Sequence, residues 1–109
     1  MNEKLTNINS NDKIYYLNIL KKEPKNYEAI LKLALIDVKE KQFSFAKEKF
    51  KDLINIDIYR YEGHLNLSNI YSHEGNLKKA KDILENFLFN IKKNIEIINA
   101  VAIILLNLK

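Results

Sequence analysis

Apolar residues recur along the chain at steps of three and four, the spacing that places them on one face of an α-helix. Ile30, Leu33, Ala34 and Val38 share such a face, and a polar stretch over residues 39–42 follows it. A second apolar face then begins, formed by Phe43, Ala46, Phe50, Leu53 and Ile54. Two amphipathic runs around a short polar turn predict a pair of antiparallel helices.

The helix pair recurs when the chain is shifted by 34 residues. The shift superimposes Leu33 on Leu67, Ala34 on Ser68, Phe43 on Leu77, Ala46 on Ala80, Phe50 on Leu84 and Leu53 on Phe87. Tyr71 and Leu88 extend the inward faces of the second pair. Gly75 and Asn76 stand at its turn, and both residue types tolerate the left-handed backbone that ends a helix. The sequence therefore predicts two consecutive units of the same structure.

These residues and this period resemble those of the tetratricopeptide repeat (TPR) family. The resemblance rests on the leucine, small-residue and aromatic positions just named, in the two whole units 27–60 and 61–94. It implies that 11–24 is the second helix of a partial repeat, with Tyr16 and Ile19 facing inward. Likewise, 95–109 would be a terminal helix of the first type, through Ile98, Val101, Ala102 and Leu105, and 1–10 a flexible N-terminus. Asp37 and His64 depart from the family pattern, since both stand where a large apolar or aromatic residue is usual.

The resemblance implies a single all-α domain, a right-handed α-α superhelical array of about six antiparallel helices. Stacked repeats of this kind form a continuous core and leave a concave surface. By resemblance, that wall comprises Leu31, Lys32, Leu35, Lys39, Leu65, Asn66, Asn69, His73, Asn99, Ile103 and Leu106. Apolar side chains beside amides suit an extended or helical peptide. In the alternative interpretation, Leu31 and Leu35 pack against the first partial helix and the asparagines are ordinary solvated positions.

Several chemistries are excluded or disfavoured by composition. The chain has no Cys and two Gly, so it holds neither a thiolate site nor a glycine-rich phosphate loop. His64 and His73 are too far apart in sequence for an i, i+4 pair of metal ligands. The basic residue and the amide by which many chaperone-binding TPR proteins hold a carboxylate are replaced by Leu31 and Leu35, and Ala100 replaces a further basic residue. We expect a non-enzymatic protein with no cofactor and no bound metal.

The charge balance gives an alternative function. The chain has a net charge of +4, and Arg60 is its single arginine. Lysines gather on the expected second helices, at Lys47, Lys49, Lys51, Lys78, Lys79 and Lys81. Helical repeat arrays can bind RNA, but these lysines alternate with carboxylates and base-reading arginines are missing. RNA binding is therefore the second hypothesis, and the preferred partner is a protein or peptide.

The end of the chain is apolar on nearly all sides. From residue 95 to 108 its polar residues are Glu96, Asn99 and Asn107. A helix of this kind is normally buried on more than one side. It is therefore expected to pack into a partner protein, to self-associate through Ile98, Ile104, Leu105 and Leu108, or to lie inside a longer array. The uncharged stretch 97–108 is shorter than the roughly 20 residues of a membrane span, and no signal peptide is evident. The sequence thus predicts a soluble, cytoplasmic interaction module acting as scaffold, adaptor or small chaperone.

Overall fold

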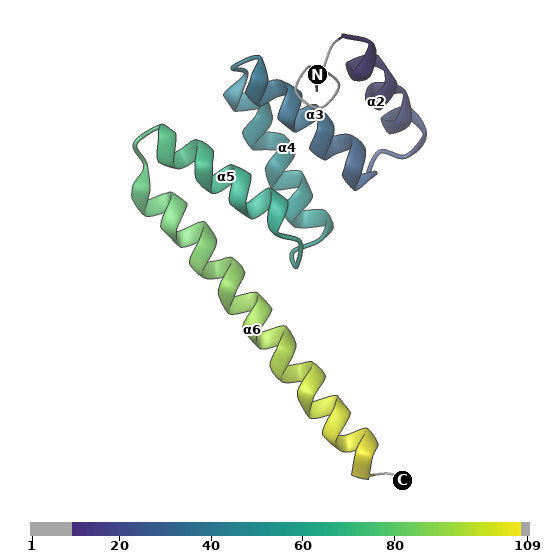
Figure 1. Cartoon of the computed structure of the whole chain (residues 1–109), viewed down its shortest axis with the longest axis vertical. Coiled ribbons are helices and arrows are strands. Elements are labelled where there is room, and N and C mark those ends of the chain that lie inside the picture. Colours follow the sequence, from purple (N-terminus) through teal and green to yellow (C-terminus); the bar gives the residue numbers. More distant parts are fainter. Residues whose placement is uncertain (1–9, 108–109) are drawn as a thin grey trace, which may run out of the picture.

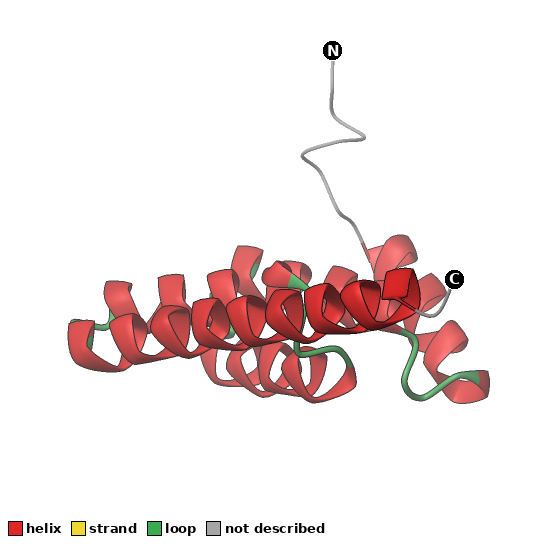
Figure 2. Cartoon of the chain, turned by 90° about the horizontal axis from the view of Figure 1, so that it is seen from below, coloured by secondary structure: helices red, strands yellow, loops and turns green. Residues whose placement is uncertain are grey.

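The chain folds into a row of α-helices joined by short turns (Figures 1 and 2). The structure is a computed structural model that describes residues 10–107, and within this range it contains five helices and no strand. The helices are α2 (Ser10–Lys22), α3 (Tyr27–Lys39), α4 (Phe43–Ile56), α5 (Tyr61–His73) and α6 (Leu77–Asn107). Each helix packs mainly on the next one along the chain. The all-α prediction is confirmed for the described residues.

The expected number of about six helices is wrong for this part of the chain, because α6 is one helix of 31 residues. The boundary between residues 94 and 95 followed from the 34-residue period and not from any local stop signal. No Gly or Pro occurs between Leu77 and Asn107, and these are the residues that usually end or break a helix. Of the N-terminal segment expected to be flexible, only Ser10 is described, and it begins α2.

The backbone repeats at the same spacing as the sequence. Helices α3 and α5 begin at Tyr27 and Tyr61, and both are 13 residues long. The turns that follow them make equivalent hydrogen bonds, in which the amide groups of Gln42 and Asn76 donate to the carbonyls of Asp37 and Tyr71. Gly75 adopts a left-handed φ of 84°, as its position in the helix stop predicts, and Lys41 adopts a φ of 62° at the equivalent place.

The core lies where the four shorter helices and the beginning of α6 meet. The small residues at equivalent positions of the two units, Ala34, Ser68, Ala46 and Ala80, are all buried, with Ala34 and Ala46 fully inaccessible. Phe50 and Leu53 of α4 are also fully buried and belong to the same core cluster. Within the two whole units 27–60 and 61–94, three residues expected on inward faces are instead exposed, namely Phe43, Leu77 and Leu88. Phe43 and Leu77 are the first residues of their helices, where a side chain has neighbours on fewer sides.

Asp37 and His64, the two polar residues that depart from the family pattern, are buried and satisfied. Asp37 forms an ion pair with the ammonium group of Lys49, across the α3–α4 hairpin. The Nε2–H of His64 donates to the carbonyl of Ile58 at 2.9 Å. Its ring lies against Phe87 of α6, with centroids 4.4 Å apart. These partners offset the cost of burying polar groups.

The second half of α6 extends away from the other helices (Figure 1). Residues of α6 are buried or half-buried at intervals up to Asn94, and every described residue from Ile95 onward is exposed. We call residues 95–107 the free half of α6. No helix in the described part of the chain is long and apolar enough to cross a membrane.

Candidate functional site

A groove lies between the end of α3, the turn after it, and the second half of α5. We call it the α3–α5 groove, and its volume is about 450 Å³. Its lining residues are Val38, Lys39, Lys41, Phe43, Asn66, Asn69, Ile70, His73 and Glu74. The size falls in the range of about 300–1,000 Å³ that is usual for ligand sites in proteins.

The groove combines an apolar surface with amide groups. Val38 and Phe43 belong to the two sides of the α3–α4 turn, and Ile70 comes from α5. Phe43 is 40% exposed, so much of its ring is available for contact. Asn66 and Asn69 supply amides from α5, one turn of helix apart. An apolar surface with a few polar groups is typical of sites that bind organic ligands and peptides.

Hydrogen bonds to the α5 backbone orient two of the polar groups in the groove. The Nδ2 group of Asn66 donates to the carbonyl of Glu62 at 2.8 Å. The Nδ1 atom of His73 lies 2.9 Å from the carbonyl of Asn69. A carbonyl can only accept, so Nδ1 donates in this hydrogen bond. The His73 side chain is thus an exposed group bonded to its own helix.

One rim of the groove carries charge of both signs. Lys39 and Lys41 lie on the α3 side, and Glu74 lies at the end of α5. Glu74 is paired with Lys47 of α4, whose Nζ is 2.8 Å from its Oε1. The ammonium group of Lys47 also lies over the ring of Tyr71, 5.0 Å from the centroid. This pair joins α4 to the end of α5 beside the groove.

The structure brings together four of the residues expected on the concave wall. Lys39, Asn66, Asn69 and His73 line the α3–α5 groove. Leu31 is buried and Leu35 half-buried, and both pack in or against the core and do not line the groove. Lys32 and Leu65 are exposed outside the groove lining.

Three further wall residues belong to the free half of α6. Asn99, Ile103 and Leu106 are expected on the wall only if a separate last helix turns back toward it. The continuous α6 instead carries them away from the other helices (Figure 1). Of the expected self-association residues, Ile98, Ile104 and Leu105 are exposed on this same segment, and Leu108 lies outside the described residues.

Five residues of the groove lining were not predicted from the sequence: Val38, Lys41, Phe43, Ile70 and Glu74. The spacing of Val38 and Phe43 matches the apolar helix faces and therefore predicts core positions for both. The helical period alone cannot show that a residue at the end of an apolar helix face is partly exposed to solvent. The position of Phe43 directly after the turn was the signal that could have identified it.

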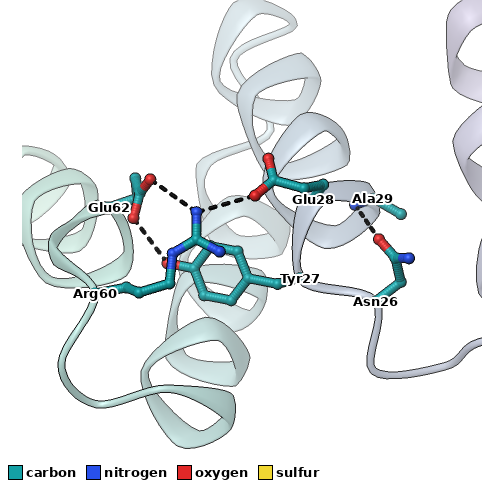
Figure 3. A network of polar contacts seen from close by, with 6 residues as sticks. All are labelled: Asn26, Tyr27, Glu28, Ala29, Arg60 and Glu62. Atoms are coloured by element: carbon teal, nitrogen blue, oxygen red, sulfur yellow. Dashed lines mark hydrogen bonds and ion pairs between the residues drawn. The ribbon is translucent and has the colours of Figure 1, made fainter.

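A network of polar contacts connects the beginnings of α3 and α5 (Figure 3). The guanidinium of Arg60 stacks on the ring of Tyr27, with its Cζ atom 3.7 Å from the ring centroid. Its Nη2 donates to carboxylate oxygens of Glu28 at 2.9 Å and of Glu62 at 3.1 Å. The hydroxyl of Tyr27 donates to the other oxygen of Glu62 at 3.1 Å. The single arginine of the chain therefore joins two repeats.

This network shifts the pKa values of its members. Burial, followed by the nearby charge and hydrogen bond of Glu62, raises the pKa of Tyr27 to about 12. Burial also acts to raise the pKa of Glu62, but hydrogen bonds from Arg60, its own backbone and Tyr27 together hold it below its ordinary value. The hydrogen bonds to Glu62 and Glu28 raise the pKa of Arg60. All three shifts favour the protonation states that the contacts in Figure 3 require.

Tyr27→Phe is expected to reduce the loss of stability at alkaline pH. The folded chain holds the Tyr27 proton up to a pH of about 12, whereas an unfolded tyrosine releases it near 10. Stability from this group is therefore complete below pH 10 and is lost as the pH rises through the folded pKa. Thermal melts across this range should show a smaller alkaline decrease for Tyr27→Phe than for wild type. Tyr59→Phe, which changes an exposed tyrosine, is the control, and equal decreases in all three proteins would contradict the prediction.

The lysines of the second helices do not form one open cationic surface. Lys47, Lys49 and Lys78 form ion pairs with Glu74, Asp37 and Asp82. Lys79 lies over the ring of Tyr71, 4.9 Å from the centroid. Across the described residues, no group of three or more His, Asp or Glu side chains is placed to hold a metal ion.

Comparison with known proteins assigns no family. No protein-family model matches the chain, and no curated protein matches it. The function of the chain is therefore inferred from the geometry of its own residues.

Proposed function

We propose that the chain is a non-catalytic protein-interaction module of the TPR-like type, which holds a peptide segment in the α3–α5 groove. The single observation that carries this proposal is the groove itself. It joins the exposed ring of Phe43 to the amides of Asn66 and Asn69 in one volume of about 450 Å³. The TPR-like assignment is supported by the 34-residue spacing of α3 and α5 and by the equivalent turns that follow them.

The chemistry of the groove fits an extended peptide with an apolar side chain. Phe43, Val38 and Ile70 offer that side chain a surface from which water is displaced. The amides of Asn66 and Asn69 can donate to and accept from a peptide backbone, which presents both kinds of group at every non-proline residue. The protein acts in this way as a scaffold or adaptor.

The proposal is tested by panning a phage library of random dodecapeptides against immobilised protein. Synthetic copies of the enriched peptides are then titrated against wild type and two groove variants, Phe43→Ser and Asn69→Ala. Phe45→Ser is the matched control, because Phe45 lies on the same helix, is 61% exposed and is outside the groove lining.

We expect enriched peptides to bind wild type with Kd values of about 1–100 μM, a range common for short peptide segments. Both groove variants should weaken binding at least about tenfold, the effect of losing roughly 1.4 kcal/mol of contact. Phe45→Ser should leave binding unchanged. Asn69 is exposed, so Asn69→Ala tests the groove without disturbing the core. Peptides that bind all four proteins equally would overturn the proposal, since they would be held elsewhere, for example on the free half of α6.

A further inference from the structure

The free half of α6 is an apolar helix whose described residues are all exposed and which extends away from the other helices (Figure 1). Eight large apolar side chains along it are between 49% and 64% exposed. They are Ile95, Ile97, Ile98, Val101, Ile103, Ile104, Leu105 and Leu106. Glu96 is the only charged residue of the segment. A contiguous exposed apolar surface of this extent marks an interaction site.

The composition of the segment makes it a poor helix in isolation. Five isoleucines and one valine stand among its thirteen residues, and β-branched residues lose side-chain freedom in a helix. An unsupported helix of this length is marginal in water even when its residues are good helix formers. Packing against another surface is what would maintain this helix.

The stripe of α6 that packs on α5 continues into the free half. Ala80 accepts a hydrogen bond from Ser68 of α5 through its carbonyl, and Phe87 contacts His64 of α5. Steps of three and four lead from these residues through the half-buried Ile91 and Asn94. The same steps continue as Ile98, Val101 and Leu105, which are exposed. The regular spacing is that of a seam between two paired helices.

We propose that a second copy of this chain covers the free half of α6, by pairing the Ile98, Val101 and Leu105 stripe of one copy antiparallel with that of the other. The occupant must itself be an apolar, nearly uncharged helix, and the free half of a second α6 meets that requirement. A two-fold pair uses one surface twice, so a patch that is complementary to itself is sufficient.

The position of α5 determines the direction of the pairing. In a parallel pair along this stripe, the α5 helices of both copies would occupy the same space between the two α6 helices. In an antiparallel pair, the C-terminal end of the partner's α6 meets the beginning of α5, which lies beside the middle of α6, and extends its line. The four shorter helices of each copy then lie at opposite ends of the pair. Antiparallel pairing also separates the two Glu96 carboxylates, which a parallel pair would bring together.

The exposed area is sufficient for a reversible dimer. Each of the eight side chains exposes about 100 Å², so the free half offers about 800 Å² per copy. Pairing along one flank covers about half of this area in each copy, about 800 Å² in total, which lies at the low end of interface sizes, among weak and transient complexes. We therefore expect a dimer with a dissociation constant of tens of micromolar, about the middle of the range for transient complexes.

Sedimentation velocity on the full chain tests the proposal, over concentrations from about 5 to 300 μM, which bracket that dissociation constant. Wild type should shift from monomer to dimer as the concentration rises. Ile98→Glu places a carboxylate on the stripe and should raise the dissociation constant at least tenfold, so its shift from monomer to dimer moves to correspondingly higher concentrations. Asn99→Glu is the matched control, because it adds the same charge one residue further at a polar position, and it should still dimerise. Far-UV circular dichroism at about 5 μM shows whether both variants keep the fold of the four shorter helices.

The direction of the pair is measured with a spin label on Lys92→Cys, in a chain that has no other cysteine. Two labels in a parallel pair lie within about 10–15 Å, whereas in an antiparallel pair they lie more than about 20 Å apart along the helix axes. A wild-type monomer at about 300 μM, far above the expected dissociation constant, would overturn the proposal. The proposal would also be overturned if Ile98→Glu and Asn99→Glu weakened the dimer equally, or if the two spin labels lay within the short distance expected of a parallel pair.

Discussion

Replacing Gly63 by alanine is expected to lower the free energy of unfolding by about 2 kcal/mol, within the range known for overpacked cores. Gly63 is buried in the first turn of α5. A Cβ atom there would lie 2.9 Å from the backbone carbonyl oxygen of Phe50 and 3.0 Å from Cγ1 of Ile54. A backbone atom in the middle of α4 cannot move without moving the helix. The clash therefore outweighs the roughly 1 kcal/mol by which alanine normally improves a helix over glycine.

Chemical denaturation of wild type and Gly63→Ala measures this difference. Gly75→Ala is the control, because a Cβ there meets nothing within 4 Å while the φ of 84° is unfavourable for alanine. It should cost about 1 kcal/mol, from backbone conformation alone. A Gly63→Ala protein as stable as wild type would show that α4 and α5 are further apart than the structure places them.

The repeat explains why Gly63 could not be identified from the sequence. The 34-residue shift superimposes it on Ala29, which is also buried. Ala29 belongs to α3, which packs on α2 as well as α4, whereas the Gly63 position in α5 approaches the α4 backbone. Equivalent sequence positions thus meet different neighbours. The period predicted the helix pairs and the buried Ala46 and Ala80, since both depend on spacing within a helix.

Other features depend on distances that no local pattern encodes. Helix α6 continues through residues 94 and 95 because no residue there stops a helix. The 34-residue period nevertheless predicted a helix boundary at this place. Most residues of the α3–α5 groove were not predicted for a similar reason. The solvent exposure of Phe43 depends on how closely α5 approaches the turn after α3, which no local pattern shows. The contact of Arg60 with Tyr27 and Glu28 joins residues more than 30 positions apart. Composition marked Arg60 as the single arginine without indicating its partners.

Replacing Lys49 by methionine is expected to cost about 2 kcal/mol, because it leaves the buried carboxylate of Asp37 without its cation. The Asp37 side chain is 9% exposed and that of Lys49 is 29% exposed. Removing one partner of a fully buried pair costs about 3–5 kcal/mol, and the partial exposure of Lys49 reduces this figure. Lys51→Met, two residues along the same helix at an exposed position, is the control and should change stability by less than about 0.5 kcal/mol.

Removing the carboxylate in place of the lysine, by Asp37→Leu, should reduce the free energy of unfolding much less. In Asp37→Leu the remaining charge is the lysine ammonium, which can reach water on its flexible stem. Leucine also restores the apolar character usual at this position of the resembled repeat, so its cost should be below about 1 kcal/mol. The double variant Asp37→Leu/Lys49→Met should recover most of the stability lost in Lys49→Met, as urea denaturation of all four proteins would show. If Lys49→Met and Asp37→Leu cost the same, the desolvated carboxylate would not be the source of the effect, and lost packing of the lysine stem would be the better explanation.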